Sequence, residues 1–264
     1  MATLSYHEQK DIENIKKLRE LQKELPSFCS DFFRGIETST STRTRIAYAY
    51  DLKIFFQFLK AANPSTFDNP SHTLTPSDLE KLTVTDLEEY IDYLKCHPSD
   101  TNEDVINTER GLMRKVSSLR SFYSYFFRNE RIEKNPAALV RMPKLHEKEI
   151  IRLEIDEVAK LLDEVEEGDK LTEKQKLYHE RTKVRDLAMM SLLLGTGIRV
   201  SECVGLNIND IDLDTCGARV YRKGGKESVI YFSDEVRDVL ENYLDEREMI
   251  DAVPGNEDAL FLSM

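Results

Sequence analysis

The sequence predicts a mainly α-helical fold in two domains, the second of which carries a small β-hairpin. Apolar residues recur at helical spacing along most of the 264 residues, which indicates helices packed on a core. β-Branched and aromatic residues concentrate at 218–221 and 228–232, on either side of Gly224-Gly225, a pattern typical of a hairpin. The stretch 141–148 combines basic residues, a proline and little periodicity, which indicates a linker between domains.

Length and these breaks place the segment boundaries. A chain of this length suits two domains of ordinary size. We expect an accessory helix at 1–26, a helical domain at 27–140, a linker at 141–150 and a mixed α+β domain at 151–264. An apolar stripe runs from Ile12 to Leu25 in the accessory helix. It predicts packing on the helical domain or on a neighbouring protomer, and a charged arm exposed to water is the alternative.

Helices account for nearly all of the expected elements. In the first domain we expect helices at 27–36, 43–61, 83–94 and 107–129, a loop around 63–70 and a turn at 96–102. The Thr/Ser tract at 38–42 supplies an N-cap for the helix at 43–61. In the second domain we expect helices at 155–166, 182–194 and 235–249, and a short helix from about Val200.

The helix expected at 107–129 has two contrasting faces. One face is an apolar stripe from Leu112 to Phe126. The other carries arginines and small hydroxyl residues and has no carboxylate: Arg110, Arg114, Ser117, Ser121, Ser124 and Arg128. Small donors allow close approach to a phosphate backbone and arginines supply charge, so this face predicts DNA binding. An ordinary solvated face is the alternative.

Composition narrows the function classes without deciding between them. The net charge is −12, but eight acidic residues fall within 154–169 against one lysine, so the rest of the surface is less acidic. No apolar run reaches the length of a membrane helix, and no signal peptide is evident. The four cysteines have no C-x-x-C spacing, so we expect a cytoplasmic protein without a metal centre or disulfides.

Two short motifs contain candidate catalytic residues. The turn Gly195-Thr-Gly197 precedes Arg199 and matches neither standard phosphate-binding motif for nucleotides. A guanidinium at such a turn suits a bidentate grip on phosphate or carboxylate, and Glu202 lies one helical turn away to orient it. At the hairpin tip, Lys223 is placed to protonate an oxyanion leaving group. The alternatives are an incidental arginine at a helix end and a solvated turn.

Together these stretches resemble the tyrosine recombinase, or phage integrase, family and are closest to Xer-like recombinases. The resemblance covers about residues 27–264. It is carried by Lys183–Glu202, by Lys223 placed 24 residues after Arg199, by Thr42-Arg43-Thr44 opening an aromatic-rich helix, and by 114–123 followed by Asn135-Pro136. It implies an N-terminal helical core-binding (SAM-like) domain and a mixed α+β catalytic domain.

The resemblance also implies a reaction, which is DNA strand cleavage and rejoining through a 3′-phosphotyrosyl intermediate. It needs no metal and no cofactor, and it serves chromosome dimer resolution or mobile-element integration. Arg199 would contact the non-bridging phosphate oxygens, Lys223 would be the general acid, and Glu202 would support Arg199. The implied partners are a double-stranded recombination site and further protomers that form a tetramer on DNA. A non-catalytic DNA-binding regulator and a helical interaction protein without a DNA role are the competing hypotheses.

The expected DNA contacts combine basic and small polar residues from both domains. They are Thr42, Arg43, Arg45, Arg110, Arg114, Lys115, Ser117, Ser121, Lys144 and Lys226.

The chain departs from the family pattern after the hairpin. The family places an H-x-x-R motif, a further His or Trp and the nucleophilic tyrosine downstream, whereas the last histidine here is His179. Tyr221, Tyr231 and Tyr243 do not lie in the context of that nucleophile. We therefore expect a catalytic domain that is C-terminally incomplete, and a chain that binds DNA without cutting it.

Overall fold

The computed structural model describes residues 6–70, 72–98, 103–146, 149, 151–222 and 226–263. The chain divides into two compact units, Glu8–Glu149 and Ile150–Met264, each with its own buried core. The predicted fold class is confirmed, because the described residues are mainly helical with small antiparallel sheets. In that part of the chain, no helix is both long and apolar enough to cross a lipid bilayer.

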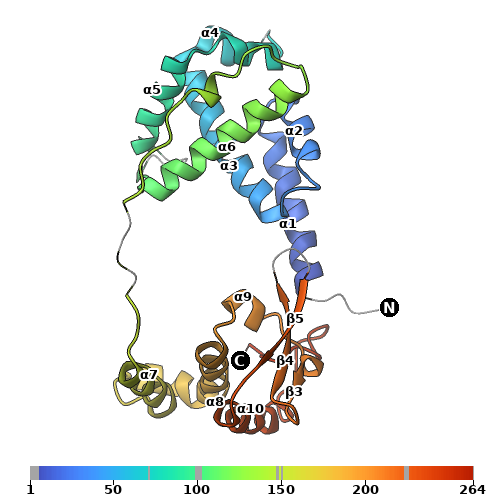
Figure 1. Ribbon diagram of the computed structural model, residues 1–264, viewed down its shortest axis with the longest axis vertical. Helices are drawn as coiled ribbons and strands as arrows, with labels where there is room; N and C mark the ends of the chain where they lie inside the picture. Colours follow the sequence, from blue (N-terminus) through green and yellow to red (C-terminus); the bar gives the residue numbers. More distant parts are fainter. Residues whose placement is uncertain are drawn as a thin grey trace. The chain divides into compact units, whose positions relative to one another are not determined.

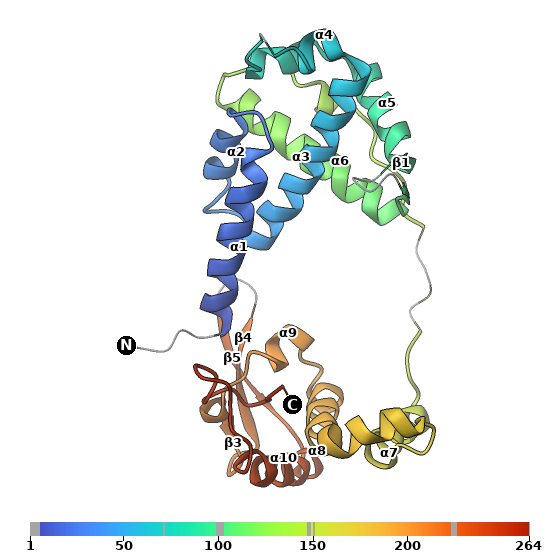
Figure 2. The same cartoon turned by 180° about the vertical axis from the view of Figure 1, so that it is seen from behind.

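The first unit, which we call the helical unit, consists of helices and a short two-stranded sheet (Figures 1 and 2). Its elements are α1 (Tyr6–Lys23), α2 (Cys29–Gly35), α3 (Thr42–Ala62), α4 (Pro64–Phe67), η1 (Pro76–Lys81), α5 (Val84–Lys95), β1 (Cys96–Pro98), β2 (Asp104–Ile106), α6 (Glu109–Arg128) and η2 (Pro136–Ala138). Helices α3 and α6 pack against each other and cross near their middles (Figures 1 and 2).

Aromatic rings fill the core of the helical unit. The fully buried Phe122 of α6 has ring centroids within 5.1–6.2 Å of those of Phe28, Phe32, Phe56 and Phe126. Several of these pairs meet edge to face, which is the arrangement that ring quadrupoles favour. Rigid packing at this crossing fixes the rotation of α3 and α6, and therefore the direction of their solvent-facing side chains.

The apolar stripe of α1 joins the same core. Leu18, Leu21 and Leu25 are buried there, whereas Ile12 near the start of the helix is 41% exposed. The second half of α1 therefore packs on the helical unit itself.

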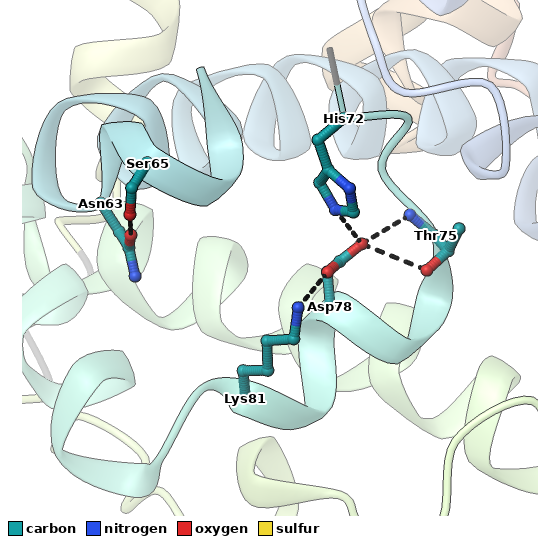
Figure 3. Close-up of polar contacts among 6 residues, drawn as sticks. All are labelled: Asn63, Ser65, His72, Thr75, Asp78 and Lys81. Atoms are coloured by element: carbon teal, nitrogen blue, oxygen red, sulfur yellow. Dashed lines mark hydrogen bonds and ion pairs between the residues drawn. The ribbon is translucent and has the colours of Figure 1, made fainter. Parts of the chain in front are cut away.

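The segment between α3 and α5 is more ordered than the predicted loop. A proline begins α4, where its missing N–H costs nothing, and Ser65 Oγ donates to Asn63 Oδ1 at 3.0 Å. Further on, the buried carboxylate of Asp78 accepts hydrogen bonds from His72, Lys81 and both the backbone N–H and hydroxyl of Thr75, at 2.7–3.1 Å (Figure 3). These bonds lower the pKa of Asp78 to about 2, against the opposing effect of burial.

The prediction of a turn at 96–102 was wrong for its first residues, because Cys96–Pro98 is a strand, and residues 99–102 lie outside the described residues. The strand pairs antiparallel with Asp104–Ile106 in the register Cys96↔Ile106 and Pro98↔Asp104. The side chain of His97 is buried while its neighbours are exposed. A strand of three residues is too short to show alternation in the sequence.

The second unit, which we call the mixed unit, combines helices with a three-stranded sheet (Figure 2). Its elements are α7 (Ile155–Glu167), α8 (Glu173–Thr196), α9 (Val200–Cys203), η3 (Ile208–Asp210), β3 (Ile211–Asp212), β4 (Gly217–Arg222), β5 (Lys226–Tyr231) and α10 (Asp234–Arg247). The strand order is β3-β4-β5, and the hairpin register runs from Gly217↔Tyr231 to Arg222↔Lys226. Helices α8 and α10 lie side by side and pack on the sheet residues Ala218 and Val220.

Helix α8 begins nine residues before the predicted start. Thr172 and Gln175 form a capping box at its first turn. Its first turns were not predicted because Leu177 and Tyr178 are 64% and 61% exposed, so no apolar periodicity marks them. The helix ends at Gly197, whose positive φ of 68° suits the left-handed conformation of a C-cap.

The segment at 257–262 is fastened to α10 by side chains. Buried Tyr243 donates its hydroxyl hydrogen to Leu260 O at 3.0 Å and accepts from Leu262 N at 3.1 Å. Buried Arg247 donates to the carbonyl oxygens of residues 257, 259 and 260 at 2.6–3.1 Å. This segment therefore forms part of the mixed unit's core.

Candidate nucleic-acid interface and active site

A groove of about 490 Å³ lies between α3 and α6 on the surface of the helical unit. Three arginines line it, Arg43 from α3 and Arg110 and Arg114 from α6, and all three are exposed. The other lining residues are small, apolar or neutral: Thr44, Ala47, Tyr48, Met113 and Ser117.

Helix geometry explains why these residues meet. Arg110, Arg114 and Ser117 are spaced i, i+4, i+7 and share one face of α6, opposite the buried stripe. Arg43 and Ala47 share a face of α3 in the same way. Because α3 and α6 cross, the two faces form adjoining walls of one groove.

The arginine-bearing face of α6 has no acidic residue of its own, but a carboxylate from α3 contacts it. Arg114 Nη1 donates to Asp51 Oδ2 at 2.5 Å, and the side chain of Asp51 is only 2% exposed, against 44% for Arg114. Burial raises the pKa of Asp51, while the cations of Arg114 and Lys115 oppose that rise.

Three of the residues predicted to contact DNA point into the unit instead. Arg45 is 8% exposed and donates to Glu37 at 2.8 Å and, more weakly, to buried Thr42 at 3.4 Å. Lys115 is also 8% exposed and donates to Asn107 Oδ1 at 2.8 Å, and its burial lowers its pKa. Residues two apart on a helix face nearly opposite sides, so Arg43 and Arg45 do not share a surface.

The remaining predicted contacts are at least partly accessible. Ser117 is exposed and donates to the Met113 carbonyl oxygen at 2.8 Å, while Ser121 is half-buried. Lys144 is exposed in the irregular segment after η2, and Lys226 is exposed at the first position of β5. Each of the latter two therefore lies on the surface of its own unit.

In the mixed unit, Arg199 stands between the Gly197 cap of α8 and the first turn of α9. Its Nη1 donates to Glu202 Oε1 at 2.7 Å, and its backbone N–H donates to Glu202 Oε2 at 3.0 Å. Glu202 is 6% exposed whereas the side chain of Arg199 is 67% exposed. A buried carboxylate therefore anchors an arginine that faces solvent.

The end of β4 lies close to this pair. The hydrogen bond from the Arg199 backbone lowers the pKa of Glu202 most, followed by the Arg199 side chain and the charge of Arg222, the last residue of β4. Strand β4 packs on α9 through buried residues that include Val220 and Cys203. The predicted general acid Lys223 follows Arg222 directly but lies outside the described residues.

These arrangements suit the binding of phosphate groups. An exposed guanidinium held by a carboxylate keeps a fixed orientation and donors for a second anion. In the groove, three exposed arginines, of which Arg114 is held by a carboxylate, line a surface on which small side chains allow a phosphate backbone to approach. Among the described residues, no three His, Cys, Asp or Glu side chains gather as ligands of a metal ion.

Comparison with known proteins gives the family. The sequence model of the phage integrase family matches residues 151–264 of this chain. The tyrosine recombinase XerS of Streptococcus uberis is 30% identical to this chain, over 94% of the chain and 75% of the relative. The chain belongs to the tyrosine recombinase family.

This chain matches other members of the family over different shares of their length. The tyrosine recombinase XerC of Caldanaerobacter subterraneus subsp. tengcongensis is 34% identical over 90% of this chain and 63% of the relative. The chain thus spans less than two thirds of the length of this relative. Among tyrosine recombinase structures, that of XerH bound to its difH substrate superposes with a TM-score of 0.55 at 15% identity, over 84% of this chain and 56% of that one. At such identity the likeness concerns the fold.

Two residues of these sites were not found by sequence reasoning. Asp51 lies 63 residues before Arg114, and no local pattern links the two. Arg222 stands beside the predicted lysine in the sequence, but its closeness to Glu202 depends on how β4 packs on α9. The spacing of Arg43 and Arg45, in contrast, was visible in the sequence. Because residues two apart on a helix lie on nearly opposite faces, this spacing would have predicted that the two arginines do not share a surface.

Proposed function

We propose that this chain is the DNA-binding and phosphate-activating part of a site-specific tyrosine recombinase. The observation that carries the proposal is the pair Arg199–Glu202 at the start of α9, in which an exposed guanidinium is anchored by a buried carboxylate on a helix that packs on β4. The reaction is strand cleavage and rejoining through a 3′-phosphotyrosyl bond. A tyrosine oxygen attacks phosphorus, and the bond to the 5′-oxygen breaks.

In this reaction each residue has a distinct task. Arg199 donates to the non-bridging oxygens and stabilises the charge that develops on them. Glu202 keeps Arg199 oriented. Lys223 gives a proton to the departing 5′-oxygen, and in the rejoining step a 5′-hydroxyl attacks the phosphotyrosyl bond and returns that proton.

The groove between α3 and α6 is proposed to hold the DNA backbone. Arg43, Arg110 and Arg114 make the phosphate contacts, and Ser117 and Ser121 allow close approach. Lys144 and Lys226 add contacts outside the groove. Thr42, Arg45 and Lys115 stabilise the helical unit rather than touch DNA, because they are buried and bonded within it.

The proposed partner is a double-stranded recombination site, on which four protomers assemble in the cytoplasm. A lambda integrase tetramer bound to a Holliday junction has the same fold, with a TM-score of 0.55 over 90% of this chain and 59% of that one, at 17% identity. Chromosome dimer resolution and mobile-element integration both fit this activity. For the 264 residues themselves we propose binding without cleavage, since Arg199 and Lys223 stabilise charge and donate a proton but neither attacks phosphorus.

DNA binding is tested by fluorescence anisotropy of the 264-residue chain on a labelled duplex. The wild-type chain should bind, and denaturing gels should show no covalent adduct. The double variant Arg43→Ala/Arg110→Ala should bind more weakly. The control is Arg237→Ala, an arginine on α10 that pairs with Asp234 and does not line the groove. Equal binding by all variants would contradict the proposed interface.

The role of Arg199 is tested in a chimera in which this chain is followed by the C-terminal part of the XerC relative, where the family resemblance places the nucleophilic tyrosine. On a nicked suicide substrate the chimera should form a phosphotyrosyl adduct in the presence of a chelator. Arg199→Ala should raise the activation free energy of this step by about 3–4 kcal/mol, which is the cost of losing one hydrogen-bond donor to an oxyanion. Arg237→Ala should not change the rate. An adduct formed equally fast without Arg199 would overturn the assignment.

A further inference from the structure

Two exposed arginines of this chain are each held by a buried carboxylate. Glu202 holds Arg199, and Asp51 holds Arg114 through Nη1 at 2.5 Å. The first pair belongs to the candidate active site. The second lies in the helical unit, where Arg114 lines the α3–α6 groove and Asp51 lies beneath it.

We propose that Asp51 is a positioning residue that holds the Arg114 guanidinium in the orientation in which it receives a DNA phosphate. This rests on the proposed function, in which the groove binds the DNA backbone. Asp51 itself does not touch DNA, because its side chain is 2% exposed.

The geometry leaves Arg114 able to bind on two sides at once. A guanidinium is a rigid plane with five N–H donors, and the hydrogen bond to Asp51 uses Nη1. The side chain remains 44% exposed and shares the groove with Arg43 and Arg110. The same group therefore binds the carboxylate on its inner edge and presents its other edge to the groove.

Burial makes the anchor persistent. Removing the cation from a buried carboxylate leaves an uncompensated charge, which is strongly unfavourable. The other nearby cation, Lys115, is itself buried and donates to Asn107. Asp51 is in turn fixed on α3, where its backbone carbonyl accepts a hydrogen bond from the buried Tyr90 hydroxyl at 3.4 Å. Arg114 therefore stays oriented before DNA arrives, and binding does not have to order it.

A purely electrostatic role for Asp51 predicts the opposite result. If Asp51 only added negative charge near the groove, Asp51→Asn would strengthen DNA binding. If it positions Arg114, Asp51→Asn should weaken binding and lower the log–log salt slope by as much as Arg114→Ala does, which is about 0.9 for one phosphate contact. Because both changes remove the same contact, the double variant should bind no worse than Arg114→Ala alone.

The experiment measures anisotropy of the full 264-residue chain on a mixed-sequence duplex across a KCl series. The variants are Asp51→Asn, Arg114→Ala and the double variant. The control is Asp31→Asn, which removes the same charge from a pair with Arg34 and Arg131 in the same unit but does not line the groove. Weaker binding by Asp51→Asn, not additive with Arg114→Ala, supports the proposal. If Asp51→Asn strengthens DNA binding, or if its effect adds to that of Arg114→Ala, the proposal for Asp51 is overturned but the proposed DNA-binding groove is not. If Arg114→Ala binds like wild type, both the proposal for Asp51 and the proposed groove are overturned.

A second measurement on the wild-type chain covers the case in which Asp51→Asn does not fold. The ¹³C shift of the Asp51 carboxyl and the ¹⁵N–¹H signals of the Arg114 guanidinium are followed while the duplex is added. Positioning predicts that the Arg114 signals shift while the Asp51 carboxyl keeps the shift of an ionised group. Protonation of Asp51 on DNA binding would show that the pair breaks, and would overturn the proposal.

Discussion

Single buried carboxylates organise the polar contacts of this chain. Asp51, Asp78 and Glu202 each have side chains at most 6% exposed, and each accepts a hydrogen bond from a cation. The sequence predicted the pairing of Arg199 with Glu202 and the common face of Arg110 and Arg114, because the residues concerned lie within one or two helical turns of each other. It could not identify Asp51, whose partner comes from another helix, and it placed Arg45 and Lys115 at the surface because basic residues usually lie there.

Asp78 allows a test at the scale of one residue. Its pKa of about 2 lies below the ordinary value of 3.8, so its carboxylate stabilises the folded state above the unfolded pKa. That contribution is lost as the pH falls from about 5 towards 2. Asp78→Asn should lower the free energy of unfolding near pH 7 by about 1–2 kcal/mol, a figure reduced from the full linkage value because Lys81 is well exposed.

The measurement is urea unfolding of both proteins at several pH values. The difference between Asp78→Asn and wild type should shrink as the pH falls through that window. A difference that stays constant with pH would mean that the substitution acts through packing rather than through the charge.

At the scale of elements, long periodic helices were predictable and short or solvent-exposed ones were not. Helix α6 was predicted within two residues at its start because its buried stripe extends from Leu112 to Phe126. The start of α8 was missed because its first turns bury no apolar side chain. The strands β1 and β2 form only through pairing with each other, and three-residue runs carry no periodic signal.

Tyr243 gives the prediction at this scale, because it joins α10 to the segment at 257–262. Its hydroxyl bonds both Leu260 O and Leu262 N in a fully buried position. Tyr243→Phe leaves the buried Leu262 N–H without this partner and removes one of the two donors to Leu260 O, which keeps its bond from Arg247, so it should lower the free energy of unfolding by about 1–3 kcal/mol. Tyr231→Phe, at a site 70% exposed, should have no measurable effect. Equal stability of the two variants in chemical unfolding would show that water replaces the Tyr243 hydroxyl.

At the scale of the whole molecule, the net charge and the proposed DNA binding point in opposite directions. The chain carries a net charge of −12, yet three exposed arginines line one groove of the helical unit. Helix α7, in the other unit, has no buried residue, and its acidic side chains are largely exposed. Acidic and basic surfaces are thus separated along the chain, and a whole-chain charge averages over them.

Because released counterions depend on local phosphate contacts, the salt slope of DNA binding should follow the groove and not the net charge. Arg43→Ala/Arg110→Ala should lower the log–log slope by about 0.9 for each lost contact. Asp163→Asn/Glu166→Gln/Glu167→Gln neutralises three exposed acids of α7 and changes the net charge by more than the arginine variant does. It should leave the slope unchanged and raise affinity only slightly, through reduced long-range repulsion that salt screens. Anisotropy titrations at several KCl concentrations separate the two cases. If the α7 variant steepened the slope as much as the arginine variant flattened it, the chain's overall charge would govern DNA binding. That result would contradict the proposal that the groove makes the phosphate contacts.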